Sequence, residues 1–106
     1  MLAFSAKWIQ PILTGKKTVT LRKWPTPRVK VGGVYDAATI GFPRKTFAKL
    51  HVTGLRKIRL RDVNDALAKT DGAESAEAVH AYWMKQGFDL GKELWLVEFE
   101  LQKSST

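Results

Sequence analysis

Residues 15–22 read G-K-K-T-V-T-L-R, and this short stretch combines a turn glycine, two lysines, two threonines and an arginine with only two apolar side chains. The apolar residues, Val19 and Leu21, alternate with polar ones, which is the pattern of a strand that has one apolar and one polar face. Hydroxyls and cations on one strand face favour a ligand that carries phosphate or carbonyl oxygens. We therefore expect both the fold and the function to depend on this strand.

The size and charge of the chain limit what surrounds the strand. With 106 residues the chain is long enough for one core, so we expect a single domain over residues 1–103 and a frayed tail over 104–106. It has 18 Lys and Arg against 10 Asp and Glu, a formal net charge of +8. That excess favours a polyanionic partner. We expect a nucleoside or RNA, and no membrane, because no apolar run approaches the roughly 20 residues that span a bilayer.

The residue types that are missing exclude several chemistries. Without cysteine there is no thiol nucleophile, disulfide or cysteine-bound zinc, which fits a reducing compartment. His51 and His80 have no second histidine at ligand spacing, so we expect neither a metal nor a cofactor. The N-terminal segment lacks the pattern of a signal peptide, and we expect a cytoplasmic protein.

The order of predicted elements indicates a mixed fold. The predicted strands cover residues 18–23, 34–40, 47–60 with a bulge at Gly54, and 94–101. A short helical element over residues 8–13 precedes the first of them. Between the last two strands we expect one helix capped by Asp62 and another that is capped by Ser75 and ends at Gly87. The pattern predicts an α+β fold, a small barrel of about five to six strands with short helices.

Several segments together resemble the ASCH (activating-signal-cointegrator homology) domain family. They are I-L-T-G-K-K-T-V-T-L-R from residue 12, V-K-V-G-G-V-Y-D from 29, A-K-T-D-G-A-E-S-A-E-A-V-H-A-Y-W from 68 and W-L-V-E-F-E from 95. The resemblance covers nearly the whole chain. It implies a PUA-like β-barrel whose short helices flank a cleft, and an association with RNA binding.

The motif is most similar to that of a small bacterial ASCH amidohydrolase, which converts N(4)-acetylcytidine to cytidine and acetate. In the G-x-K-T-x-T-x-R run, Lys17 stands at the catalytic lysine and Thr20 at the catalytic threonine. The catalytic glutamate of that enzyme precedes the second helix. This chain offers Asp71 there, with Glu74 as the second choice.

The same residues make chemical sense without the resemblance. A chain without cysteine or paired histidines must attack an amide with a hydroxyl, for which Thr20 is the candidate, or with a bound water. Lys17 can act as the base if burial or nearby cations lower its pKa. Asp71 or Glu74 would hold and protonate the leaving amine, and Arg22 or the backbone amides near Gly15 would stabilise the oxyanion.

A second group of residues is predicted to bind nucleic acid. A basic stripe alternates with apolar residues along one predicted strand, and it is either a phosphate-binding face or a solvated surface. Two tryptophans adjoin the motif and are candidates for base stacking, whereas Trp83 and Trp95 are expected in the core. The predicted binding residues are Trp8, Lys16, Arg22, Trp24, Lys57, Arg59 and Arg61.

Three functions follow from these observations. The first is a metal-independent amidohydrolase acting on an acylated cytosine nucleoside, which the lysine-threonine motif favours. The second is a non-catalytic RNA-binding module, which the net charge favours. The third is a ribonuclease that uses the same lysine.

Overall fold

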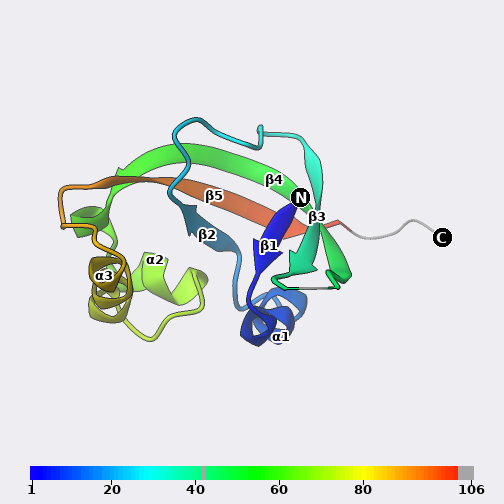
Figure 1. Ribbon diagram of the computed structural model, residues 1–106, viewed down its shortest axis with the longest axis horizontal. Helices are drawn as coiled ribbons and strands as arrows, with labels where there is room; N and C mark the ends of the chain where they lie inside the picture. The colour runs from blue at the N-terminus through cyan, green and yellow to red at the C-terminus, as the bar shows by residue number, and fades with distance from the viewer. Residues whose placement is uncertain (42, 103–106) are drawn as a thin grey trace.

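The computed structural model describes residues 1–41 and 43–102, so the predicted tail over 104–106 lies outside the described residues. The described residues form one curled sheet and three short α-helices, and the predicted α+β class is confirmed (Figure 1). The strands are β1 (Leu2–Phe4), β2 (Val19–Arg22), β3 (Val34–Thr39), β4 (Thr46–Arg59) and β5 (Glu93–Leu101). The helices are α1 (Ile9–Leu13), α2 (Asp65–Thr70) and α3 (Ala76–Lys85), with 3₁₀ turns η1 (Ala6–Trp8) and η2 (Leu60–Asp62).

The long antiparallel pair β4 and β5 forms the centre of the sheet. The strand order is β1-β3-β4-β5-β2, so β2 is an edge strand. The pairing of β4 with β5 shifts register between Val52 and Gly54, which confirms the predicted bulge and bends the strand. In Figure 1 these two strands form an arch with the helices beneath it. Strand β1 pairs in parallel with β3 and was not predicted from the sequence.

Two apolar clusters stabilise the curled sheet. One fills the space between β1, α1 and the inner parts of β3, β4 and β5, and includes Leu2, Phe4, Ile12, Leu50, Val52 and Phe99. The other joins the opposite end of the sheet to α2 and α3, and includes Val19, Leu21, Ile58, Ala68, Val79 and Leu96. The second cluster holds α2 and α3 against the edge strand β2, and this contact positions the candidate site.

The start of α2 differs from the prediction. Asn64, rather than Asp62, is the N-cap residue, and its side chain accepts a hydrogen bond from the backbone N–H of Leu67. Asp62 instead lies in η2, where burial of Leu60 fixes a separate turn. The predicted cap of α3 is confirmed, because the Ser75 hydroxyl accepts from the N–H of Ala78.

The end of α3 also follows the prediction. Gly87 follows the C-cap residue Gln86 and has a φ of 92°, a left-handed conformation that glycine adopts without steric cost. Across residues 1–41 and 43–102, no helix combines the length and the apolar character needed to cross a membrane.

The second cluster gives a test of the fold. Leu96 is completely buried between β2 and β4, so Leu96→Ala should lower the free energy of unfolding by about 2–5 kcal/mol through lost burial and a residual cavity. Leu90→Ala, at a leucine that is 40% exposed, is the matched control and should cost much less. Urea denaturation measures both, and equal costs would contradict this packing.

Candidate active site

Lys17 lies in the short connection between α1 and β2, and its backbone is fixed at both ends. Its N–H donates to the carbonyl of Pro11 at 2.9 Å, and the next N–H, of Thr18, donates to the carbonyl of Thr70 at 2.7 Å. The regular strand starts only at Val19, one residue later than predicted. The direction of the Lys17 side chain is therefore not set by strand alternation, and its ammonium reaches Asp71 at the end of α2.

Asp71 binds the Lys17 ammonium through two oxygens. Nζ donates to the Asp71 carboxylate Oδ1 at 2.5 Å and to the Asp71 backbone carbonyl at 2.8 Å. The side chain of Lys17 is 3% exposed and that of Asp71 is 18% exposed. The two residues are 54 positions apart in the sequence, and Asp71 is the C-cap of α2. The end of one helix thus supplies the counterion for a lysine beside the edge strand.

Trp8 covers the ion pair, and Gly72 makes this possible. The Lys17 Nζ lies 4.7 Å from the centre of the Trp8 ring, a cation–π distance. A Cβ atom at Gly72 would lie only 2.6 Å from Cζ3 of Trp8, and Gly72 also has a φ of 89°. A side chain at position 72 would therefore push the indole away. Trp8, predicted as a base-stacking residue, here packs over the lysine.

Burial controls the electrostatics of the pair. Removal from solvent lowers the pKa of Lys17, and the attraction of Asp71 only partly opposes this effect. Burial likewise raises the pKa of Asp71, although Lys17 and Arg22 favour its ionised form. Because both shifts disfavour charge, they bring the proton affinities of the two groups closer together. Burial thus opposes the charge on both members of the pair, while their mutual attraction favours it.

Arg22 and Thr20 lie at alternate positions of β2, next to this pair in sequence. Arg22 donates from Nη2 to the carbonyl of Ala3 at 2.8 Å, and its guanidinium lies 4.8 Å from the Phe4 ring centre. Its Nε is buried and, within the described part of the chain, has no hydrogen-bond partner. Thr20 is buried at 6% exposure. In residues 1–41 and 43–102 the Lys17 ammonium hydrogen-bonds Asp71 and not Thr20.

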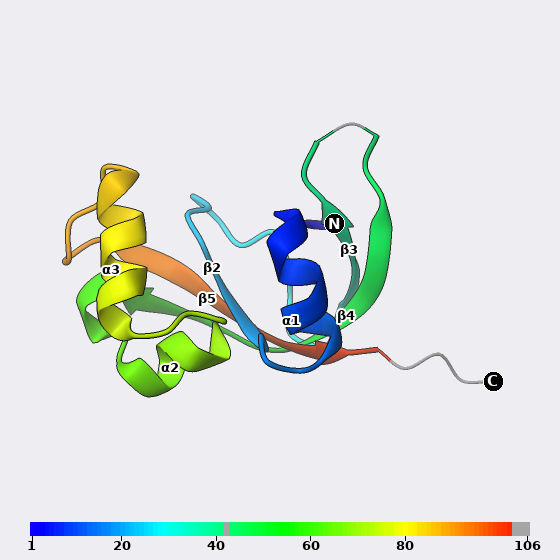
Figure 2. The same cartoon turned by 90° about the horizontal axis from the view of Figure 1, so that it is seen from below.

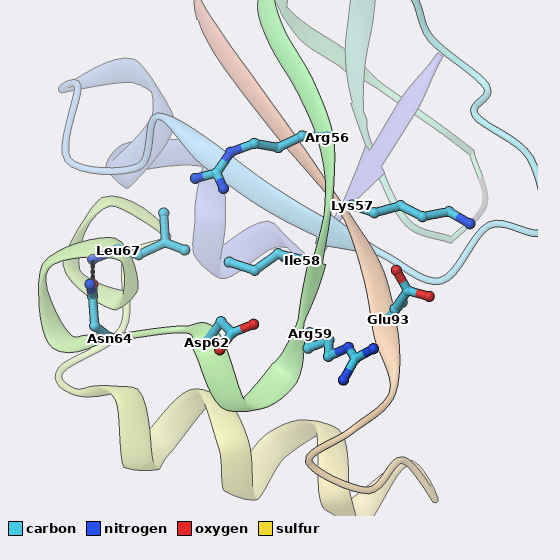
Figure 3. A pocket seen from close by; sticks show the side chains of 8 residues that line it. All are labelled: Arg56, Lys57, Ile58, Arg59, Asp62, Asn64, Leu67 and Glu93. Carbon is cyan, nitrogen blue, oxygen red and sulfur yellow. Dashed lines mark hydrogen bonds between the residues drawn. The ribbon is translucent and has the colours of Figure 1, made fainter.

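The structure separates the other predicted site residues from this cluster. Glu74 and Lys16 are exposed, so Asp71 rather than Glu74 is the carboxylate that contacts Lys17. The predicted stripe is shorter than expected, because Arg61 lies in η2 and not on β4. Lys57 and Arg59 are exposed on one side of β4, and Figure 3 shows them opposite Arg56 and Ile58.

The surface is hollowed in two places near the end of β4. The pocket in Figure 3 has a volume of about 480 Å³ and lies between β4, η2 and the start of α2. The other has a volume of about 700 Å³ and lies between β2, β5 and the end of α3. Neither hollow is lined by Lys17 or Asp71. The absence of both residues from the lining agrees with their burial beneath Trp8. The ion pair is thus separate from both hollows.

The position of Trp95 differs from the prediction. It was expected in the core with Val97 and Phe99, which share its strand face and are buried. Trp95 is only half-buried, because its neighbours across the sheet are Arg22 and Lys57 rather than apolar residues. It lines the larger hollow, together with the predicted stacking residue Trp24. The strand pattern alone does not show where the curled sheet stops enclosing a core.

Solved structures resemble this chain over most of its length. An ASCH domain from Lactobacillus crispatus superposes with a TM-score of 0.66 at 18% identity, covering 88% of this chain and 69% of that one. An ASCH protein from Zymomonas mobilis, solved as a point mutant, gives a TM-score of 0.64 at 14% identity, covering 93% and 66%. The chain has the ASCH-domain fold. The predicted small PUA-like barrel with flanking helices is thereby confirmed.

A further solved structure is similar to this chain. A protein from Enterococcus faecalis matches with a TM-score of 0.68 at 17% identity, covering 94% of this chain and 74% of that one. No family model matches the sequence, and no curated protein matches it. The similarity that is found thus lies in the three-dimensional arrangement of the chain.

The buried pair gives a stability prediction with a pH dependence. Lys17→Met leaves the Asp71 carboxylate without its counterion and should lower the free energy of unfolding by about 3 kcal/mol at pH 7. The pKa of Asp71, already raised by burial, would rise further, so the folded state would bind a proton more readily than the unfolded state. The deficit should therefore shrink as the pH falls toward 4.

Urea denaturation at the two pH values measures this effect. The exposed pair between Lys49 and Asp36 provides the control, because its side chains are 64% and 45% exposed. Lys49→Met should cost less than about 1 kcal/mol at either pH. A Lys17→Met variant as stable as the Lys49→Met control would show that the buried pair does not constrain the fold.

Proposed function

We propose that the protein is a metal-independent amidohydrolase that removes the acyl group from the N4 amine of an acylated cytosine nucleoside. The observation that carries the proposal is the buried ion pair of Lys17 and Asp71. Both residues stand where the ASCH resemblance implies a catalytic lysine and carboxylate. A buried lysine–carboxylate pair whose two pKa values are shifted in opposite directions is also an arrangement found at sites of acid–base catalysis.

Asp71 is the member of the pair that would face a substrate. Its side chain is 18% exposed whereas that of Lys17 is 3% exposed, so a ligand at the surface would meet the carboxylate first. The raised pKa of Asp71 suits a group that takes a proton and returns it in one reaction cycle. Asp71 thus serves as the base for attack and then as the acid for the leaving group.

Lys17 holds the Asp71 carboxylate from the buried side of the pair. Two hydrogen bonds from Nζ reach Asp71 oxygens, which orients the carboxylate and balances its charge. Since Lys17 donates to Asp71 rather than interacting with Thr20, we assign the nucleophile to water and not to the threonine hydroxyl. Thr20 and Arg22, at alternate positions on β2, are proposed to polarise the acyl oxygen.

The reaction is balanced with these groups alone. Asp71 removes a proton from water while the water oxygen bonds to the acyl carbon, forming a tetrahedral oxyanion. The carbon–nitrogen bond then breaks, and Asp71 returns the proton to N4 of cytosine. The products are the free nucleoside and the carboxylic acid, which ionises in water.

The proposal predicts a difference between the two acidic residues of the α2–α3 loop. Asp71→Asn keeps the size of the side chain but cannot accept a proton, so it should lower kcat for N(4)-acetylcytidine by about 100-fold or more. Glu74→Gln is the matched control, because Glu74 is exposed and away from the Lys17 ammonium, and it should keep near wild-type rates.

Chromatographic measurement of released cytidine checks this prediction, with thermal melting to confirm that each variant folds. Full activity of Asp71→Asn would remove the carboxylate from the mechanism. If the wild-type protein releases no cytidine, hydrolysis of this substrate is excluded. A non-catalytic RNA-binding module would then be the better account of the net charge of +8.

A further inference from the structure

Gly72 ends α2 and also forms part of the surface on which Trp8 lies. The N–H of Ala73 donates to the carbonyl of Ala68 at 2.9 Å, which is the bond of a Schellman motif with a left-handed residue after the helix. Gly72, with a φ of 89°, is that residue. A Cβ atom on it would lie 2.6, 3.2 and 3.4 Å from three carbon atoms of the Trp8 ring. Position 72 therefore requires glycine both for its backbone and for this contact.

Gly87 ends α3 with the same motif but has no such contact. Its φ is 92°, and the N–H of Phe88 donates to the carbonyl of Trp83 at 3.2 Å. Apart from its chain neighbours, no atom of the described residues lies within 4 Å of the place that a Cβ on Gly87 would take. An alanine would meet similar backbone strain at positions 72 and 87, and it would displace a ring only at position 72.

The Trp8 ring contacts two lysine ammonium groups that differ in burial. Its centre lies 4.7 Å from the Nζ of Lys17 and 5.1 Å from the Nζ of Lys7. Lys17 is buried, Lys7 is exposed, and Trp8 itself is half-buried. The ring also lies beside Gly72, which directly follows Asp71 in the chain. The indole therefore stands at the boundary between the ion pair and solvent.

An indole suits this boundary because it attracts a cation without accepting its protons. The Lys17 ammonium has three N–H donors, and two of them reach oxygens of Asp71. The face of an aromatic ring attracts the ammonium electrostatically, and it excludes water that would otherwise compete for these donors. Trp8 thus leaves Asp71 as the acceptor that orients Lys17, and the carboxylate is in turn held in one position.

The charged groups around the pair come from several elements. Burial is the main cause of the lowered pKa of Lys17, and the charges of Arg22 on β2 and Lys7 on η1 lower it further, against the attraction of Asp71. Burial is also the main cause of the raised pKa of Asp71, which the charges of Lys17 and Arg22 oppose. Burial lowers the pKa of Arg22 as well, and the charges of Asp71 and of Tyr82 on α3 oppose this. Exposure to water is thus the largest change that a variant could make to the pair.

We propose that Trp8 is a positioning residue for the hydrolysis proposed above, because its ring keeps water away from Lys17 and so lets Lys17 hold the Asp71 carboxylate in place. Gly72 is needed because glycine alone leaves room for the ring. Trp8 acts through the ion pair and not by contact with the substrate. The catalytic part of this inference rests on the proposed function, whereas the exclusion of water from the pair can be measured without a substrate.

The first test compares Gly72→Ala with Gly87→Ala by NMR titration of the Asp71 carboxyl carbon. Water that reaches the pair in Gly72→Ala removes the main cause of the raised Asp71 pKa, and this loss outweighs the weaker attraction of Lys17. The Asp71 pKa should therefore fall toward 3.8 in Gly72→Ala and stay at the wild-type value in Gly87→Ala. Equal Asp71 pKa values in the two variants would overturn the proposal.

The second test compares the same variants as enzymes. Gly72→Ala should lower kcat for N(4)-acetylcytidine by about 10-fold or more with little change in KM, because Asp71 loses its fixed position while the substrate loses no contact. Asp71 must be ionised to accept a proton from water, so the low-pH limb of kcat/KM should move to lower pH together with its pKa. A loss of stability alone would not move this limb. Gly87→Ala should keep the wild-type rate and limb, and the same values for Gly72→Ala would contradict the proposal.

Trp8→Leu tests the ring without straining the backbone, and it replaces Gly72→Ala if that variant does not fold. It should lower the Asp71 pKa and kcat as Gly72→Ala does, and Trp8→Phe, which keeps a smaller ring, should recover part of both. Adding Gly72→Ala to Trp8→Leu should reduce kcat little further, since the contact that Gly72 permits is already lost. Full additivity would show that Gly72 acts independently of Trp8, against the proposal.

The titration separates this inference from the proposed function. An active wild type whose Asp71 pKa is the same in Gly72→Ala and Gly87→Ala retains the hydrolysis and overturns the role of Trp8. A wild type that releases no cytidine, with an Asp71 pKa that falls only in Gly72→Ala, excludes the hydrolysis and retains the role of Trp8 in holding the pair away from water.

Discussion

The burial of one lysine with one aspartate is the constraint on which the rest of this structure depends. A cation that is 3% exposed needs a counterion with close hydrogen bonds, because an unpaired buried charge is strongly destabilising. That counterion comes from the end of α2, 54 positions further along the chain. The second helix must therefore dock against the edge of the sheet, and the backbone bond from Thr18 to Thr70 fixes the same contact.

The curled sheet makes this docking possible. The bulge at Gly54 bends β4 and β5, so the two apolar clusters form at different ends of one sheet. Strand β2 lies at the edge, with α1 and α3 on its two sides in Figure 2. One end of β2 leads to the ion pair, and the other end leads to the larger hollow, which is lined by Trp24 and Trp95.

Local sequence patterns predicted the features that depend on neighbouring residues. The strand around Val19 and Leu21, the bulge at Gly54 and the Ser75 cap each have a signal within a few positions. Features that depend on distant contacts were not predicted. Strand β1 has only three residues and forms because it pairs with β3. Trp95 lies outside the core because its cross-strand neighbours, Arg22 and Lys57, are charged.

In the candidate site, too, local features were predicted and distant contacts were not. The sequence predicted the motif, Lys17 and the two candidate carboxylates. The choice of Asp71 over Glu74 depended on which of them the turn after α2 brings to the ammonium, and loop spacing does not contain that information. The packing of Trp8 over Lys17 could not be predicted from the sequence either, because it depends on Gly72, which is distant from Trp8 in the sequence.

The central claim is that burial brings the proton affinities of Lys17 and Asp71 together. An NMR titration of the Asp71 side-chain carboxyl carbon, with ¹³C-labelled protein, measures this directly. The account predicts that Asp71 titrates above the ordinary aspartate pKa of 3.8 and that Lys17 titrates below 10.5. An Asp71 pKa at or below 3.8 would contradict it, because the carboxylate would then be an ordinary salt-bridge partner and not a group prepared to carry a proton.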